Sequence, residues 1–248
     1  MTDSQRFFAA REVVLSESVT EEGIGTLGEK TLHKILKIYI DPDPKHHEVK
    51  HLGVIADVKN DEGVFEIQTR NFERLLPKLK RLLAQTRVTV VCPVIRSKSL
   101  RWINKSTGEL SEARKSPKTE TACDAFRNLY RIKEFIDNPN LRIRLIFLDA
   151  EEFKYLDGWD KSGKKGATRA ERIPTALLEI ADINSPSEYA AYLPKSLGET
   201  FTAAEFSKAI KRTPRYSYNV LRFFLFVGAI ERTENQGRAF SYSRRKTY

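Results

Sequence analysis

The sequence predicts an α/β domain followed by a small basic domain of two helices and a β-hairpin. Up to about residue 190, helical and strand-like patterns alternate along the chain. The runs Arg87–Ile95 and Leu141–Leu148 are almost wholly apolar, as expected of strands covered on both faces. After residue 195 the pattern changes to a capped helix, a second helix and a turn-rich hairpin. We therefore expect domains over residues 1–190 and 195–248, connected through Ser185–Lys195.

The first part of the α/β domain is expected to contain one clear helix. Residues 1–20 have no strong period, and Glu12–Leu15 has the composition of a short strand. Apolar residues at helical spacing predict a helix over Thr26–Tyr39. The run Asp41–Pro44 (DPDP) then ends it, because proline restricts the backbone of the residue before it.

Three short strands and a helix follow. The strand-like runs are His47–Leu52, Val54–Val58 and Val64–Thr69, and the turn residues Asn60–Gly63 separate the last two. The next helix is expected to begin at Pro77, since proline is well tolerated at the first helical position.

The remainder of the α/β domain combines basic segments with one helix. Ser97–Pro117 predicts a hairpin that turns at Lys105–Gly108, and Cys123–Ile136 predicts a helix. Lys161–Arg172 predicts a loop rich in glycine and lysine, whereas Ile173–Ile183 gives no clear prediction.

The formal net charge is +10, and the positive charge is concentrated in three segments. Residues 195–248 hold 11 Lys and Arg against 4 Asp and Glu. Arg96–Lys118 holds 7 against 2, and Lys161–Arg172 holds 5 against 1. Such clusters can neutralise phosphates and release counterions, which favours a nucleic-acid partner. The alternative is that these segments are ordinary solvated loops.

Membrane and export signals are not expected from the sequence. The chain has no apolar run of about 18 residues, and Met1–Arg11 lacks the charged-then-apolar order of a signal peptide. Cys92 and Cys123 both lie among apolar residues, as buried thiols in a reducing compartment do. We therefore expect a cytoplasmic protein that does not enter a membrane.

Acidic residues occur at suggestive positions in the predicted helix and strands. Glu29 lies near the start of the first helix, and Asp57 lies at the end of the second strand. Glu66 and Gln68 share one face of the third strand, because side chains alternate along a strand. If the second and third strands pair, Asp57 stands beside Glu66. Two such carboxylates can hold Mg²⁺, which prefers oxygen ligands and can activate water.

This arrangement resembles the PD-(D/E)XK nuclease superfamily over about Gly23–Ile95. The matching pieces are Gly28–Lys30 on the first helix, Ala56–Asp57 at the end of the second strand and Phe65–Gln68 in the third strand. The resemblance implies a restriction-endonuclease-like mixed sheet flanked by helices over residues 1–190. The layout as a whole also resembles a group of bacterial proteins, a likeness that implies no activity.

By this resemblance Asp57 and Glu66 are metal ligands for Mg²⁺ or Mn²⁺, and Glu29 completes a catalytic site. Gln68 occupies the position where the superfamily usually has lysine. A neutral amide can orient a water but cannot supply positive charge, so catalysis and its loss both stay open. Arg70, two residues on, is a candidate to replace the missing charge. The alternative is that Asp57 and Glu66 are ordinary turn and strand residues.

Three other signals are weaker. Gly23–Gly28 matches G-x-G-x-x-G, but no predicted strand leads directly into it, so a flexible entry loop is the better interpretation. His46 and His47 point to opposite faces of a strand, which disfavours a zinc site. Trp102 and Trp159 are better explained by packing than by base stacking.

The C-terminal segment resembles the winged-helix family. Thr202 and Glu205 form a capping box that begins a helix ending near Arg212. A second helix follows Thr213-Pro214 and runs to Val227, before a hairpin that turns around Glu234–Gly237.

The winged-helix resemblance implies duplex DNA contacts from the second helix, the wing and the tail. The residues expected to make them are Arg215, Tyr216, Ser217, Asn219, Arg222, Arg238, Arg244 and Arg245. The alternative is a protein-interaction module, with Phe223 and Phe226 as interface residues.

Together these patterns favour a Mg²⁺-dependent, endonuclease-like protein that grips duplex DNA through its winged helix. A non-catalytic DNA-binding regulator and a protein-interaction module, both built on a degenerate nuclease fold, are the alternatives. The sequence leaves open whether the chain is a monomer or a homodimer, and which DNA it acts on.

Overall fold

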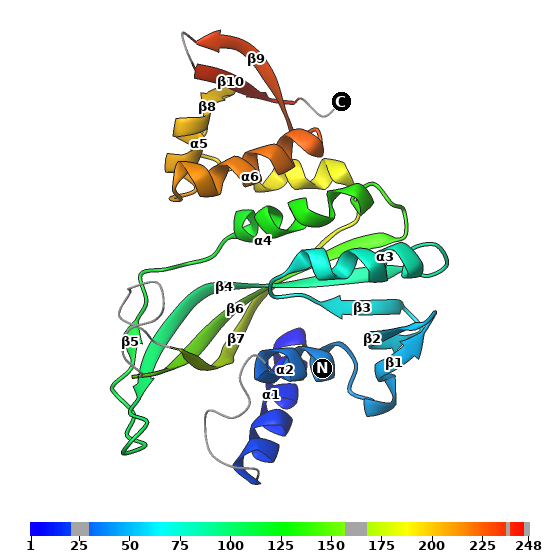
Figure 1. Ribbon diagram of the computed structural model, residues 1–248, viewed down its shortest axis with the longest axis vertical. Helices are drawn as coiled ribbons and strands as arrows, with labels where there is room; N and C mark the ends of the chain where they lie inside the picture. Colours follow the sequence, from blue (N-terminus) through cyan, green and yellow to red (C-terminus); the bar gives the residue numbers. More distant parts are fainter. Residues whose placement is uncertain (21–29, 157–167, 237–238, 246–248) are drawn as a thin grey trace.

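The computed structural model describes residues 1–20, 30–156, 168–236 and 239–245. Within these residues the chain forms a seven-stranded mixed sheet flanked by helices and a separate three-stranded sheet near the C-terminus (Figure 1). The coarse prediction of an α/β protein is therefore confirmed.

The large sheet has the strand order β1-β2-β3-β4-β6-β7, with β5 paired to β4. The first three strands pair antiparallel, β4 pairs parallel with both β3 and β6, and β7 pairs antiparallel with β6. The strands span His47–His51 (β1), Val54–Asn60 (β2), Gly63–Ile67 (β3), Val88–Ile103 (β4), Arg114–Lys115 (β5), Leu141–Tyr155 (β6) and Arg169–Ile183 (β7). The two apolar runs predicted as buried strands are the first halves of β4 and β6, at the centre of the sheet.

Helices cover both faces of this sheet (Figure 1). Helices α1 (Asp3–Thr20) and α2 (Lys30–Ile40) lie on one face, and α3 (Leu76–Leu82) and α4 (Ala122–Leu129) lie on the other. Alternate residues of β4 divide between the two cores, so that Val91 packs with the α1–α2 side while Val90 packs with the α3–α4 side. The shorter 3₁₀ helices are Pro44–His46 (η1), Phe72–Leu75 (η2), Tyr130–Phe135 (η3) and Pro186–Tyr192 (η4).

The expectation of a short strand over Glu12–Leu15 is wrong, because these residues belong to helix α1. Helix α1 buries Phe7, Ala10 and Val14, which recur at spacings of three and four residues. This narrow stripe is the signal of a helix, but polar and charged residues surround it and obscure the period. Packing against α2 then decides the conformation.

Strands β4, β6 and β7 run well beyond the apolar segments that predicted them. Past a bulge between Ile95 and Ser97, β4 continues into the predicted basic hairpin and pairs there with β6 and β5. Strand β7 includes Ile173–Ile183, for which there was no clear prediction, and begins within the predicted Lys161–Arg172 loop. Residues 161–167 of that loop lie outside the described residues, as do Trp159 and the Gly23–Gly28 match.

The C-terminal part follows the predicted order of helix, helix and hairpin. It contains β8 (Thr200–Thr202), α5 (Ala203–Ala209), α6 (Pro214–Phe226), β9 (Ile230–Gln236) and β10 (Ala239–Arg244). The predicted capping box is present, since Thr202 Oγ1 accepts from the Glu205 amide and Glu205 accepts from the Thr202 amide. Strand β8, which pairs with β10, was not predicted.

Helix α6 packs against α4, so the C-terminal part and the large sheet share one continuous hydrophobic core. Phe223 is fully buried, and its ring stacks on Phe126 of α4 with centroids 5.3 Å apart. Tyr189, in the predicted connection, contacts both rings edge-on. The Ser185–Lys195 segment is therefore packed into the core rather than acting as a free linker.

Candidate carboxylate site where two strands separate

Asp57 lies where the pairing between β2 and β3 ends. The last paired residues are Val58 and Phe65, so one further step in register sets Asp57 opposite Glu66. The amide of Ile67 donates to Asp57 Oδ2 at 2.8 Å, so the carboxylate takes the place of a main-chain acceptor. His33 of α2 approaches the same oxygen, with Nε2 3.2 Å away.

Glu66 is almost fully buried, at 1% exposure, and projects toward α3. Lys78 Nζ donates to Glu66 Oε2 at 2.5 Å, while Glu66 Oε1 accepts no hydrogen bond from the described residues. Burial raises the pKa of Glu66 to about 7, and the negative charge of Asp57 adds to the rise despite the opposing effect of Lys78. The charge of Asp57 therefore disfavours ionisation of Glu66.

The pKa of Asp57 moves the other way. Burial acts to raise it, but the His33 hydrogen bond and charge, the Ile67 amide and the charge of Lys78 together lower it. Asp57 is thus held ionised beside a neighbour that resists ionisation. Paired carboxylates with opposite pKa shifts in a buried setting are typical of functional sites.

Asp57 and Glu66 offer carboxylate oxygens of the kind that a hard divalent cation prefers. Glu66 Oε1 is a buried acceptor without a donor among the described residues, which a cation would satisfy. Glu29, the expected third member, lies outside the described residues. Within the described part of the chain, no group of three or more His, Cys, Asp or Glu side chains is arranged to hold a metal.

The Gln68 amide bonds to the main chain of the turn that follows β3. Its Nε2 donates to the carbonyl oxygens of Arg70 and Asn71, the latter at 3.3 Å. Asn71 has a left-handed backbone, with φ of 56°, so the amide braces a strained turn between β3 and η2. The cation that contacts Glu66 is instead Lys78, which was not predicted from the sequence. A lysine in the first turn of the helix after the third strand is the signal that could have found it.

A basic pocket of about 510 Å³ opens beside the carboxylates. Its lining includes His33, Gln68 and Glu48 together with the cations Lys34, Lys37, Arg70 and Arg74. Lys37 is paired with Glu48 at 2.8 Å. The excess of positive charge over this one carboxylate suits the pocket to an anionic ligand such as a phosphate.

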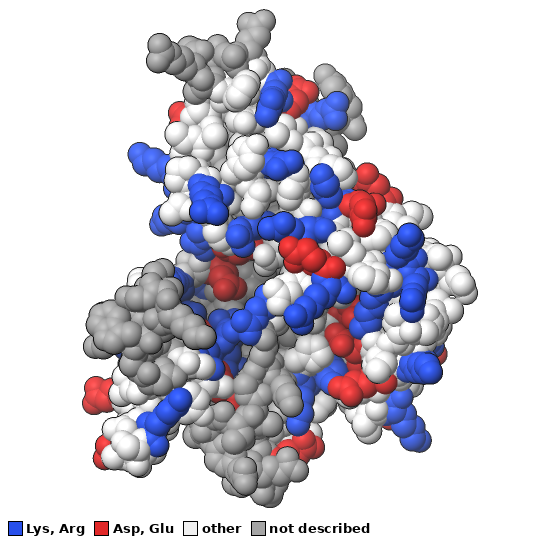
Figure 2. All heavy atoms as spheres, viewed as in Figure 1, with Lys and Arg blue, Asp and Glu red and all other residues white. Residues whose placement is uncertain are grey.

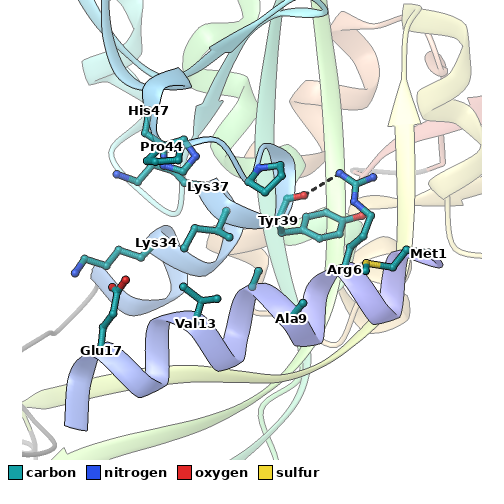
Figure 3. A pocket seen from close by; sticks show the side chains of 13 residues that line it. Met1, Arg6, Ala9, Val13, Glu17, Lys34, Lys37, Tyr39, Pro44 and His47 are labelled. Atoms are coloured by element: carbon teal, nitrogen blue, oxygen red, sulfur yellow. Dashed lines mark hydrogen bonds between the residues drawn. The ribbon is translucent and has the colours of Figure 1, made fainter. Parts of the chain in front are cut away.

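A second groove, of about 600 Å³, lies between α1 and α2 (Figure 3). Lys34 and Lys37 line both this groove and the basic pocket. Val13 and Ile38 contribute to its mainly apolar lining. The groove therefore adjoins the basic pocket but lacks the chemistry of the carboxylate pair.

The residues expected to reach DNA from α6 occupy different environments. Arg215 and Arg222 are exposed, and Asn219 is half-buried. Ser217 is buried and donates to Thr213 O at 3.0 Å, and the Tyr216 hydroxyl donates to Asp124 Oδ1 at 2.5 Å. The prediction that Ser217 contacts DNA is wrong, because its side chain is buried, and the Tyr216 hydroxyl is already paired with Asp124.

The remaining predicted contacts are in the C-terminal hairpin and tail. Arg244 donates to the carbonyl of Pro194 at 2.6 Å and so helps to hold the C-terminal part together. Arg245 is exposed, and Arg238 lies outside the described residues. Phe226 is 42% exposed.

Lysine and arginine side chains gather across the middle of the face shown in Figure 2, around a hollow below the C-terminal part. A few carboxylates lie among them.

No described helix is both long and apolar enough to span a bilayer.

The sequence model of a protein family, described as a domain of unknown function (DUF8091), matches residues 30–184, more than half of the chain. A protein of Treponema pallidum (strain Nichols), named "Uncharacterized protein", is 31% identical over 167 residues. That match covers 67% of this chain and 64% of the relative, so the chain spans less than two thirds of the relative's length. No solved structure matches the chain. The family match includes both carboxylates, Lys78 and the basic pocket, and ends before the C-terminal part.

Proposed function

The chain belongs to the family defined by the domain of unknown function DUF8091, and we propose that it is a metal-dependent, endonuclease-like phosphodiesterase that acts on DNA. One observation carries the proposal. Asp57 and Glu66 meet where β2 and β3 separate, with opposite pKa shifts and an unpartnered, buried oxygen on Glu66. This is a costly arrangement for a structural pair and a useful one for a cation site.

The order of elements supports a PD-(D/E)XK-like core. Helix α2 precedes the antiparallel strands β1–β3, and α3 then leads into β4, which is parallel to β3. Helices α2 and α3 lie on opposite faces of the sheet. Asp57 and Glu66 occupy the positions in this layout that the resemblance assigns to metal ligands.

Mg²⁺ or Mn²⁺, when bound, would supply charge neutralisation and an acidified water. The Asp57 carboxylate is oriented for this role by the Ile67 amide and His33, which both contact Oδ2. Glu66 would contribute Oε1 to the metal, because this oxygen accepts no hydrogen bond from the described residues. Arg70 and Arg74 in the basic pocket can hold phosphates of the substrate strand.

DNA as the substrate is supported by charge. The C-terminal part, proposed to be a winged helix, carries the exposed Arg215, Arg222 and Arg245. Residues 195–248 hold 11 Lys and Arg against 4 Asp and Glu, an excess suited to a polyanion.

The test is cleavage by the purified full chain on single-stranded, duplex, flapped and junction DNA, with Mn²⁺, Mg²⁺ or EDTA. We expect cutting that requires the metal and is abolished by Glu66→Gln and by Asp57→Asn. Glu62→Gln, at an exposed residue of the β2–β3 turn, is the matched control and should cut normally. Equal cutting by wild type and Glu66→Gln would reveal a contaminant.

A non-catalytic DNA-binding regulator is the second candidate. It is favoured by the Lys78–Glu66 pair, which already balances charge at the carboxylates, and by Gln68 in place of lysine. DNA binding without cleavage of any substrate, together with no Mn²⁺ binding by calorimetry, would select this function.

A further inference from the structure

At the carboxylate site the positive charge comes from Lys78 on helix α3. The position after β3, where the resemblance leads one to expect lysine, holds the neutral Gln68. Phosphodiester attack builds negative charge, and a positioned ammonium beside the carboxylates stabilises it. Position 68 offers no such charge, because Gln68 is neutral and its amide donates to the carbonyls of Arg70 and Asn71. Any positive side chain at the site must therefore come from another element.

Lys78 reaches the site from the first turn of α3. Pro77 fixes the start of this helix, and Leu79, the next residue, is fully buried, so the backbone of Lys78 is firmly held. Its Nζ bonds to Glu66 Oε2, and the Lys78 side chain is only 20% exposed. A charge this close to a buried carboxylate is weakly screened by solvent.

Lys78 also leaves the rest of the site available. It contacts Oε2 of Glu66, while Oε1 accepts no hydrogen bond from the described residues. The ammonium thus pairs with one oxygen of Glu66 and leaves the other available.

We infer that Lys78 supplies, from α3, the positive charge that position 68 lacks, and that Gln68 serves only the turn after β3. This inference rests on the proposed phosphodiesterase function. It names Lys78 as the charge-stabilising residue of that site in preference to Arg70, which lines the basic pocket beyond the end of β3.

The experiment moves the charge from helix to strand. Lys78→Met keeps the length of the side chain and removes its charge, and Gln68→Lys is added to it in a double variant. Lys78→Arg keeps the charge, and Lys80→Met removes an exposed lysine from the same helix as the control. Each protein is assayed for DNA cleavage with Mn²⁺, for Mn²⁺ affinity by calorimetry and for Tm.

We expect Lys78→Met to lower cleavage by about 10²-fold or more, by comparison with the loss of one positioned charge-stabilising group. Mn²⁺ binding should survive, because Asp57 and Glu66 Oε1 are intact. Gln68→Lys should recover at least about tenfold of the lost rate, an effect that repair of packing on α3 would not produce. Lys78→Arg should retain most activity and guards against a folding failure of the methionine variant.

Undiminished cleavage by Lys78→Met overturns the inference and leaves the phosphodiesterase function standing. The inference is also overturned if Lys78→Met loses cleavage together with Mn²⁺ affinity or Tm, and if adding Gln68→Lys does not restore cleavage. Arg70→Met would then be expected to carry the defect instead. A wild-type chain that cuts none of the four substrates overturns the function and the inference together.

Discussion

Arg212 grips Asp124 through two guanidinium nitrogens, with Nε 3.0 Å from Oδ1 and Nη2 2.9 Å from Oδ2. Asp124 also accepts from Tyr216 and from the Thr121 amide, where it completes the capping box that begins α4. One carboxylate therefore ties the α5–α6 segment to the helix that covers the large sheet. This contact adds to the shared hydrophobic core in holding the C-terminal part.

Replacing Asp124 with Ala should destabilise the protein by roughly 3–5 kcal/mol, because it leaves the Arg212 charge and two donors without their partner. Arg212→Ala should cost less, since its side chain is 25% exposed. Urea denaturation of both variants and of the double variant gives the coupling between them. Lys211→Ala, at an exposed neighbour, should be nearly neutral, and a similar loss there would show a general effect of the turn.

Phe223→Ala should destabilise by about 3–5 kcal/mol, since it empties a site between Phe126 and Tyr189 in the shared core. We also expect the α/β part and the C-terminal part of this variant to unfold in one transition, because one hydrophobic cluster includes residues of both. Matching midpoints by far-UV and near-UV circular dichroism check this. Phe226→Ala, at an exposed ring of the same helix, is the control, and two separate transitions would contradict the shared core.

The cross-strand cluster around Glu152 predicts an acid-sensitive extension of the sheet. Glu152 Oε2 accepts from Lys98 at 2.9 Å and from Arg172 Nη2 at 2.7 Å. Burial acts to raise the pKa of Glu152, but Arg172 and Lys98 together lower it to about 2. A carboxyl whose folded pKa lies below its ordinary 4.5 contributes stability that is fully present above pH 4.5 and is lost as the pH falls toward 2.

The lowered pKa of Glu152 corresponds to roughly 3 kcal/mol at neutral pH. Glu152→Gln should therefore be less stable than wild type at pH 7, and this difference should shrink between pH 4.5 and 2.5. Urea titrations across that range measure it, with Glu151→Gln, on the other face of the strand, as the comparison. A difference independent of pH would mean that packing rather than charge explains the loss.

The elements with strong local signals could be predicted from the sequence. Pro77, the Thr202–Glu205 capping box and the apolar runs of β4 and β6 act within a few residues, so their outcome follows from local chemistry. Helix α1 and the long strand β7 could not be predicted, because their conformation depends on partners distant in the chain. Helix α1 has only a narrow apolar stripe, and β7 is paired along its length with β6.

The candidate site likewise contains residues that could be placed from the sequence and residues that could not. The strand order placed Asp57 and Glu66 as neighbours, because a hairpin register extends from a short turn. Lys78 and His33 could not be placed, since each reaches the carboxylates from a helix on a different face of the sheet. The burial of Ser217 and the partial burial of Tyr216 were missed because they depend on α6 packing against α4.

Binding of duplex DNA should depend on the exposed arginines of α6. Arg215→Ala and Arg222→Ala should each weaken binding, and each lost phosphate contact should reduce the slope of log affinity against log salt by about one unit. Arg222 lies over the rings of Tyr130 and Tyr218, with centroids 5.0 Å and 5.6 Å away, so its variant should show the smaller change. Fluorescence anisotropy between about 50 and 200 mM salt measures both quantities.

Lys50→Ala, an exposed lysine on β1 at the edge of the large sheet, is the control for a general loss of charge. If all three variants lose affinity equally and without a change of slope, the contact is not local to α6. If Arg215→Ala and Arg222→Ala bind like wild type, the C-terminal part does not grip duplex DNA through this helix. In that event the protein-interaction alternative gains weight, and Phe226, whose ring is 42% exposed, is the first residue of α6 to test for it.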